Sequence, residues 1–554
     1  MIGVVSKEGE EEIVKEFFEL FKVPWEFYNE NRKYPVVLST QDSLNGLDAK
    51  LVFLYSSEKL RFDIENKINV TPLQENKALL KYKELQLPVY GKISFFGFSS
   101  DTETKLNKTT GEAIGIEIKN DDRRIIRIGF DLFQEVYFLL TSGQPIEFSH
   151  IPSLDLHISI LRELILEYGI PLVEIPPVPA GYDYVCCLTH DIDFAGIKCH
   201  KFDHTFFGFI YRATLGSCID LLRGRSSLKK LLKNLKAVLL LPAVYLGIAR
   251  DFWNQLDDYN KIEKEAPSTF FLIPFKNESG KGFNGNTEQW RATRYDILDI
   301  KKEVQKLRSM GCEIGLHGID AWVDSEKGRQ ELQRISQITG DNEIGVRMHW
   351  LYFNHESPRI LEEAGFYYDS TLGYNDAVGY RNGTTQAFKP IGVEKLLELP
   401  LNVQDTALFY PGRMALSEGE ASSLIDRLIE NSTIFGGVLT INWHDRSLAP
   451  ERLWGDFYIE LLKKMRKRKV WFGTAKEIVR WFNKRRASSF GEIRYTSNTV
   501  KLAVKSENTN TPLEFVLRVH LPKEKSHEKI ATEYERSYID LSFSSKLETE
   551  ISFT

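Results

Sequence analysis

Two aspartates, Asp191 and Asp193, close an apolar run in the stretch YVCCLTHDIDFAG. Side chains two residues apart on an extended chain point to the same face, so one carboxylate could serve a metal ion and the other a substrate. His190, next to Asp191, is expected to point away from both and to serve packing. Pairs of this kind also occur in solvated turns and helix caps, so the pair indicates a site only together with other reactive groups.

Histidines elsewhere in the same part of the chain supply such groups. His317 closes the apolar run in CEIGLHG, and His444 closes another in GVLTINWH. The stretch GVRMHWLYF adds Arg347 and His349. A single histidine is most often a satisfied core residue, but several in one region, two of them at the ends of apolar runs, favour a site.

The elements that must position these residues are parallel strands. From Tyr184 onward, apolar stretches of strand length alternate with amphipathic stretches of helical length. This alternation predicts an α/β fold, with parallel strands and crossover helices in an open sheet or a barrel. Such folds bind their ligands at the carboxyl ends of the strands. Both aspartates, His317 and His444 fall at these ends.

Three parts of the chain differ in pattern. Residues 1–179 mix helical stretches with short β-rich runs and predict an N-terminal α/β domain. Residues 180–486 hold the reactive groups and predict the catalytic domain, with a helical insertion near 196–253. Residues 487–554 alternate with a period of two and predict a small C-terminal all-β module.

The composition limits the partners of the protein. A net charge of -5 argues against nucleic acid as a partner. Five cysteines without C-x-x-C spacing, together with an N-terminus unlike a secretory signal, predict a cytoplasmic protein. The apolar stretch within the insertion is too short to span a membrane. The basic amphipathic segment 226–249 leaves two interpretations open, peripheral contact with lipid and a helix packed on the domain.

The motifs resemble those of the polysaccharide deacetylases of the NodB-homology type, carbohydrate esterase family four. THDID is similar to the first signature of that family, usually T-F-D-D-G, and EIGLHG matches the first histidine of its H-x-x-x-H signature. VRMHW and VLTINWH are similar to the third signature and to the final strand that ends in histidine. The resemblance covers roughly Gly181 to Arg486, and it implies a distorted (β/α) barrel.

The resemblance also implies a reaction and roles. Asp191 would be the general base, held in place by Arg347, and His444 the general acid. Asp193 and His317 would bind a divalent metal, foremost Zn²⁺, with Co²⁺ or Ni²⁺ as alternatives. The substrate would be a carbohydrate, an N-acylated amino sugar of a polysaccharide or glycan precursor, that loses its acyl group, foremost acetyl, by hydrolysis of a carbon–nitrogen bond.

The sequence departs from the family at Ala321, where the second histidine of H-x-x-x-H would stand. We predict that His349 replaces it, with Asp320 as the alternative third ligand. If neither serves, the chain would be a catalytically inactive protein that binds glycans or acts as a scaffold. The fold could also hydrolyse a different amide. The residues expected to bind substrate are Trp350, Asp369, Tyr374 and Trp443.

Overall fold

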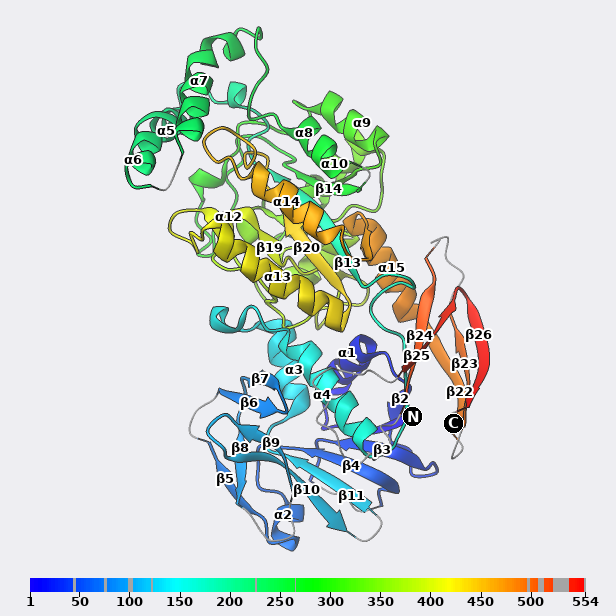
Figure 1. Ribbon diagram of the computed structural model, residues 1–554. Coiled ribbons are helices and arrows are strands. Elements are labelled where there is room, and N and C mark those ends of the chain that lie inside the picture. The colour runs from blue at the N-terminus through cyan, green and yellow to red at the C-terminus, as the bar shows by residue number, and fades with distance from the viewer. Residues whose placement is uncertain are drawn as a thin grey trace.

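The computed structural model of the 554-residue chain has a lower part around one large sheet, an upper part around a second sheet, and C-terminal strands beside them (Figure 1). Among the residues that the structure describes, no helix is both long and apolar enough to cross a membrane. The structure describes the whole chain apart from residues 43–45, 74–76, 98–102, 121–122, 225–226, 265, 496–498, 507–512, 522–537 and 553–554.

The N-terminal sheet is mixed. Five neighbouring strands, in the order β2-β1-β3-β4-β11, pair in parallel, and β10 begins the antiparallel part that continues through β9, β6 and β7. Its strands are β1 Ile2–Val5, β2 Trp25–Phe27, β3 Tyr34–Ser39, β4 Ala49–Tyr55, β5 Asn69–Pro72, β6 Ala78–Tyr82, β7 Leu85–Val89, β8 Ser94–Gly97, β9 Glu103–Lys108, β10 Ala113–Asn120 and β11 Arg123–Ile128.

Helices pack against this sheet with their apolar faces. In α1 (Glu11–Phe21) the buried side chains recur at helical spacing, as Val14, Phe17, Phe18 and Phe21, and they join the same core as the sheet. The other helices of this part are α2 (Arg61–Glu65), α3 (Leu132–Thr141), α4 (Ser153–Glu167) and the 3₁₀ turn η1 (Ile146–Phe148).

The second sheet is parallel throughout its described strands and has the order β18-β17-β16-β15-β14-β13-β20-β19, with β21 also on β13. No ladder joins β18 to β19 among the described residues, so the expected barrel is a curled, open half-barrel. Its strands are β13 Tyr184–Ile192, β14 Ser268–Leu272, β15 Glu313–Gly318, β16 Val346–Met348, β17 Tyr368–Asp369, β18 Leu397–Glu398, β19 Val403–Gln404, β20 Val438–Asn442 and β21 Val470–Phe472.

Side chains alternate between the two faces of β13. Cys186 and Leu188 belong to the core shared with the surrounding helices, whereas Val185 and Cys187 pack with Trp481 of α15. The helices around this sheet are α8 Leu256–Glu263, α9 Lys301–Ser309, α10 Ser325–Thr339, α11 Ser357–Ala364, α12 Asp405–Phe409, α13 Glu418–Phe435, α14 Gly455–Met465 and α15 Ala475–Ala487. Short turns are η4 Gln289–Arg291 and η5 His349–Leu351.

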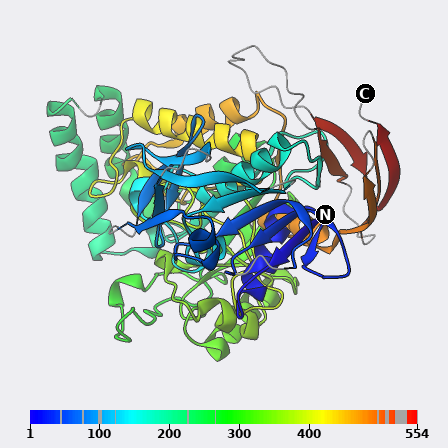
Figure 2. The same cartoon turned by 90° about the horizontal axis from the view of Figure 1, so that it is seen from below.

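A helical insertion follows β13 and stands at the edge of the molecule in both views (Figures 1 and 2). It begins with the turn η2 (Ile197–Cys199) and continues through α5 (His204–Tyr211), the π-helical segment η3 (Arg212–Gly216) and α6 (Ser217–Leu222). The helix α7 (Leu228–Tyr245) packs back on η3 and α6. The chain then returns to α8 and the second strand of the half-barrel.

The C-terminal strands form two small sheets that lie beside the rest of the molecule (Figure 2). One has the order β22-β23-β26, and the other combines β24 and β25 with β12, which precedes the half-barrel in the chain. Arg485 of α15 donates to the carbonyls of Leu20 and Ile175, linking this region to the N-terminal part. The strands are β12 Leu172–Glu174, β22 Ser489–Tyr495, β23 Thr499–Lys505, β24 Phe515–His520, β25 Tyr538–Phe543 and β26 Lys546–Ser552.

Candidate active site

The inner face of the half-barrel carries the reactive side chains at its carboxyl edge. Val185 and Cys187 occupy the inner face of β13, so the period of two places Thr189, Asp191 and Asp193 above them. In the register of the neighbouring strands, His317 of β15 pairs with Arg347 of β16. The ends of parallel strands meet at one edge, and groups far apart in sequence therefore converge there.

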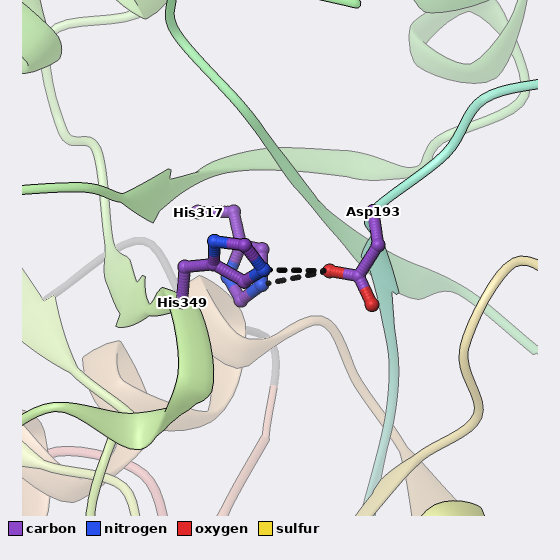
Figure 3. Close-up of side chains that lie close together, drawn as sticks. All are labelled: Asp193, His317 and His349. Atoms are coloured by element: carbon purple, nitrogen blue, oxygen red, sulfur yellow. Dashed lines mark ion pairs between the residues drawn. The ribbon is translucent and has the colours of Figure 1, made fainter. Parts of the chain in front are cut away.

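Asp193, His317 and His349 form a compact group (Figure 3). Asp193 Oδ1 lies 3.3 Å from His317 Nε2 and 3.5 Å from His349 Nε2. One ligand atom from each residue lies within 4.8 Å of the others. Asp193 Oδ1 is buried and accepts no hydrogen bond from any described residue. Three ligand atoms of this kind fit a zinc-like cation that keeps a further position open for water.

The surroundings of the two imidazoles and of the carboxylate differ. His317 Nδ1 lies 2.9 Å from the Arg347 carbonyl oxygen, so it carries the proton and leaves Nε2 as the lone-pair atom. Burial lowers the pKa of His349 well below its usual range, and the Asp193 carboxylate opposes this only in part. Burial raises the pKa of Asp193, but His317, His349 and His444 together outweigh burial and hold that pKa low. A low pKa in Asp193 and in His349 suits cation binding, because both ligands must then be unprotonated.

The structure brings His349, and not Asp320, to Asp193. Asp320 Oδ1 accepts a hydrogen bond from the Lys281 amide at 2.7 Å, and its other oxygen pairs with Lys327, so its carboxylate is occupied elsewhere. His349 sits at the start of a turn in which the next residue, Trp350, has a left-handed backbone with φ of 66°. Non-glycine residues in that region are strained, and such strain is frequent at functional sites.

Asp191 is held from two sides. Arg347 Nη1 donates to Asp191 Oδ1 at 3.0 Å, and Asn442 Nδ2 donates to Oδ2 at 2.8 Å. Arg347 is fully buried, and its other hydrogen bonds go to Thr189 Oγ1 at 2.6 Å and to the carbonyl and hydroxyl oxygens of Ser370, both at 2.9 Å. The carboxylate is therefore fixed in orientation and balanced by an adjacent cation.

His444, two residues beyond the end of β20, is paired with Asp405. Asp405 Oδ1 lies 2.5 Å from His444 Nδ1, and Oδ2 accepts from the His444 amide at 2.7 Å. Burial lowers the pKa of His444, but the Asp405 carboxylate overcomes burial and the pKa rises to about 9. Asp405 occupies Nδ1, so Nε2 is the ring nitrogen left to act as an acid, on a side chain that is 13% exposed.

Sequence reasoning did not single out Asp405 or Asn442. Asp405 directly follows the run LPLNVQ, so it is a carboxylate at a strand end like Asp191, but the strand there, β19, has only two residues. Asn442 lies two residues before His444 and therefore on the same face of β20. The period of two could have found Asn442.

Two expected substrate-binding residues lie away from this edge. Asp369 follows Tyr368, whose hydroxyl donates to Glu313, so Asp369 points to the opposite face of β17. There it is 1% exposed beside Glu398, and burial raises its pKa to about 6. Tyr374 donates its hydroxyl to the Gln144 carbonyl at 2.7 Å and so joins the half-barrel to the N-terminal part.

Trp443 is a core residue rather than part of a cleft. It directly follows β20 and is fully buried in the core shared with the surrounding helices, with its ring 5.0 Å from that of Tyr458 and 6.1 Å from that of Phe457. His190 also points outward, as the sequence predicts, and its Nε2 lies 2.8 Å from Glu263 Oε1.

Trp350 is the one expected substrate-binding residue that is exposed at the site. It is 41% exposed, and its ring lies 5.8 Å from that of His349. Phe283, 63% exposed, continues the aromatic rim through a 4.4 Å contact with Tyr352. Exposed aromatic faces of this kind provide stacking surfaces for sugar rings.

No protein-family model matches the sequence, and no curated protein matches it significantly. Among solved structures, the chain is similar to a protein of Mycobacterium smegmatis assigned to the polysaccharide deacetylases, at 18% identity over 56% of this chain and 95% of that one, with a TM-score of 0.33. It is similar to the carbohydrate deacetylase Agd3 at 9% identity over 99% of both chains, with a TM-score of 0.37.

A third similarity is to the Xyl-CE4 domain of a multidomain xylanase from the hindgut metagenome of Trinervitermes trinervoides. The identity is 13% over 54% of this chain and 91% of that one, and the TM-score is 0.23. In the order of its motifs and in the side chains that they bring together, the chain resembles the polysaccharide deacetylases of the NodB-homology type.

Proposed function

We propose that this protein is a metal-dependent hydrolase that removes an acyl group, foremost acetyl, from an N-acylated amino sugar of a polysaccharide or glycan precursor. The observation that carries the proposal is the convergence of Asp193, His317 and His349, one carboxylate and two imidazoles, beside Asp191 and His444. Nitrogen and oxygen ligands in this number, next to a base and an acid, are typical of metal-assisted amide hydrolysis.

Asp193, His317 and His349 would hold the metal, with Zn²⁺ as the first candidate and Co²⁺ or Ni²⁺ as alternatives. Such a cation, when bound, lowers the pKa of a water molecule towards about 7 and polarises the substrate carbonyl. The side chains around it would then need only to move protons and to place the substrate.

Asp191 would take the proton from the attacking water. Its two oxygens are fixed by Arg347 and Asn442, which keeps the carboxylate in one orientation as the proton arrives. His444 would give a proton to the departing amine from Nε2. With a pKa of about 9, it is protonated at neutral pH, as a general acid must be.

The test is acetate release from soluble N-acetylglucosamine oligosaccharides by the metal-loaded protein. We expect release that falls at least about 100-fold in Asp191→Asn and in His444→Gln, because general acids and bases of this kind contribute on that order. Binding of the oligosaccharides without any hydrolysis would instead favour the inactive glycan-binding alternative. Hydrolysis of another amide, without release of acetate from the oligosaccharides, would support the mechanism but assign a different substrate.

The three parts of the chain would have different roles. We propose residues 180–486 as the catalytic domain, with residues 1–179 and 487–554 as flanking domains. We also propose a cytoplasmic protein, because the five cysteines lack the spacing of a disulfide framework or a thiolate metal site. A glycan precursor, rather than a finished wall polymer, is the substrate that such a location favours.

A further inference from the structure

The helical insertion exposes an unusual amount of apolar surface. Twelve of the twenty-three large hydrophobic side chains that are exposed among the described residues lie between residues 202 and 248. The most exposed are Leu222 at 87%, Leu239 at 81% and Ile248 at 79%. Isolated exposed side chains are ordinary, but a concentration of this kind marks an interaction surface.

On α7 the exposed residues form two parallel rows. Leu228, Leu232 and Leu239 are four and seven residues apart and therefore share one face of the helix. A row of exposed lysines runs beside these leucines. It consists of Lys229, Lys233 and Lys236.

The opposite face of α7 is already used. Leu231, Ala237, Leu241 and Val244 are buried, and all but Leu231 belong to the small core of the insertion with Phe209. The α5–η3–α6 segment has an exposed row of its own, with Phe207, Tyr211 and Leu215 at four-residue spacing. The two apolar rows therefore stay exposed to solvent when the insertion folds.

The charge of the insertion identifies what could cover these rows. Between residues 204 and 248 the sequence has seven basic residues and one acidic residue, Asp220, in a chain whose net charge is -5. Lysines beside leucines on an exposed helix face are the pattern of helices that lie in the interface of a membrane. A second copy of the same surface would instead bring lysine against lysine, which is unfavourable.

The insertion is firmly rooted at the edge that carries the site. The Asp251 carboxylate accepts hydrogen bonds from the amides of Ile197 and Lys198, at 3.1 and 3.0 Å, and so ties the end of the insertion to its beginning. Asp445, next to His444, accepts from the amides of Phe194 and Ala195 at 2.8 and 2.9 Å.

Contacts of the root also reach the rim of the site. Arg446 stacks on Phe194 and Trp253, at 4.3 and 4.1 Å from the ring centroids. His204 of α5 contacts Trp290, a 68% exposed residue of the loop that also contains Phe283. A surface to which the insertion binds would therefore lie near the exposed rim of the active site.

We propose that the α5–α7 insertion binds the surface of an anionic phospholipid bilayer, with the leucine row in the interface and the lysine row against the headgroups. The chain would then lie on the membrane without crossing it. If the function proposed above holds, the consequence is a substrate presented at that surface, a glycan carried on a lipid. The docking itself rests only on the insertion.

The test is co-flotation of the full-length protein with vesicles of phosphatidylglycerol and phosphatidylcholine, compared with phosphatidylcholine alone. We expect binding to the anionic vesicles that weakens as salt rises. The double variant Leu232→Asp, Leu239→Asp should lose at least about tenfold in affinity, because it replaces apolar side chains that enter the interface by carboxylates. The triple variant Lys229→Glu, Lys233→Glu, Lys236→Glu should lose at least as much, because each lysine near an anionic surface contributes about fivefold.

Ile64→Asp is the matched control, since Ile64 is 64% exposed on α2 in the N-terminal part and should bind vesicles like wild type. Asp193→Asn should also bind like wild type, which separates docking from hydrolysis. No preference for anionic vesicles, or binding by both insertion variants that equals that of wild type, would overturn the proposal. A dimer that the leucine variant dissociates, without vesicle binding, would assign the surface to a second copy and overturn it as well.

Discussion

His349 Nε2 lies 3.5 Å from Asp193 Oδ1, whereas Ala321, four residues after His317, offers no ligand atom at all. The register of the half-barrel explains this exchange. His317 pairs with Arg347 on the neighbouring parallel strand, so a residue two positions beyond Arg347 reaches the same edge as His317 itself. A ligand lost from one strand end can therefore be supplied by the next strand.

Replacing Asp405 by asparagine should move the pH dependence of hydrolysis. His444 acts in its protonated form, so activity is lost as pH rises through its pKa, which is about 9. Loss of the carboxylate at Nδ1 lowers that pKa, and the basic limb of kcat/KM should move to lower pH in Asp405→Asn. The measurement is kcat/KM against pH for both proteins.

Asp320→Asn is the matched control for this change, because it neutralises another buried carboxylate of the half-barrel that does not touch His444. Its basic limb should coincide with that of wild type. A limb that stays in place in Asp405→Asn would show that His444 is not the acid, or that Asp405 does not set its pKa.

Arg347→Met should destabilise the fold. It leaves the buried Asp191 carboxylate with Asn442 as its remaining side-chain donor among the described residues. Breaking a buried ion pair from one side costs about 3–5 kcal/mol in the free energy of unfolding. Adding Asp191→Asn should restore part of this loss, because the unpaired charge disappears.

Urea unfolding of metal-free protein measures the change. Arg359→Met, at a 55% exposed side chain paired within α11, should alter the free energy of unfolding by less than about 1 kcal/mol. Equal effects of Arg347→Met and Arg359→Met would mean that the buried pair contributes nothing to stability.

Two tryptophans should respond in opposite ways to replacement by alanine. Trp443→Ala opens a cavity between Phe457 and Tyr458 and should lower the free energy of unfolding by about 3–5 kcal/mol. Trp350→Ala removes a 41% exposed ring, so its stability should stay within about 0.5 kcal/mol of wild type while KM for the oligosaccharide rises. Thermal unfolding and steady-state kinetics separate the two, and an unchanged KM in Trp350→Ala would remove that residue from the substrate site.

The parts of the site that could be predicted from the sequence are those at the ends of long apolar runs. Asp191 and His317 lie one residue before the ends of β13 and β15, which have nine and six residues, and Asp193 directly follows β13. Their spacing fixes the face that they occupy. Asp405 could not be predicted, because β19 has only two residues, too few to show the alternation of a strand.

Two of the expected substrate-binding residues, Trp443 and Asp369, lie away from the site for one physical reason, which is the alternation of side chains across a strand. Trp443 stands one residue beyond Asn442 and must face outward if Asn442 faces Asp191. Asp369 faces away for the same reason, as the neighbour of inward-pointing Tyr368. The polar or aromatic character of a residue does not by itself indicate the face of the strand on which it lies. The open edge between β18 and β19 could not be predicted from the sequence, because each of these strands is only two residues long.

The central claim, a metal centre completed by His349, is tested most directly by elemental analysis of the purified protein and its variants. We expect about one zinc or similar ion per chain in wild type and in Asp320→Asn, and loss of the ion in His317→Ala and His349→Ala. Retention of the metal by His349→Ala together with its loss in Asp320→Asn would contradict the assignment. A wild-type protein that stays metal-free after incubation with zinc, cobalt or nickel would contradict the whole mechanism.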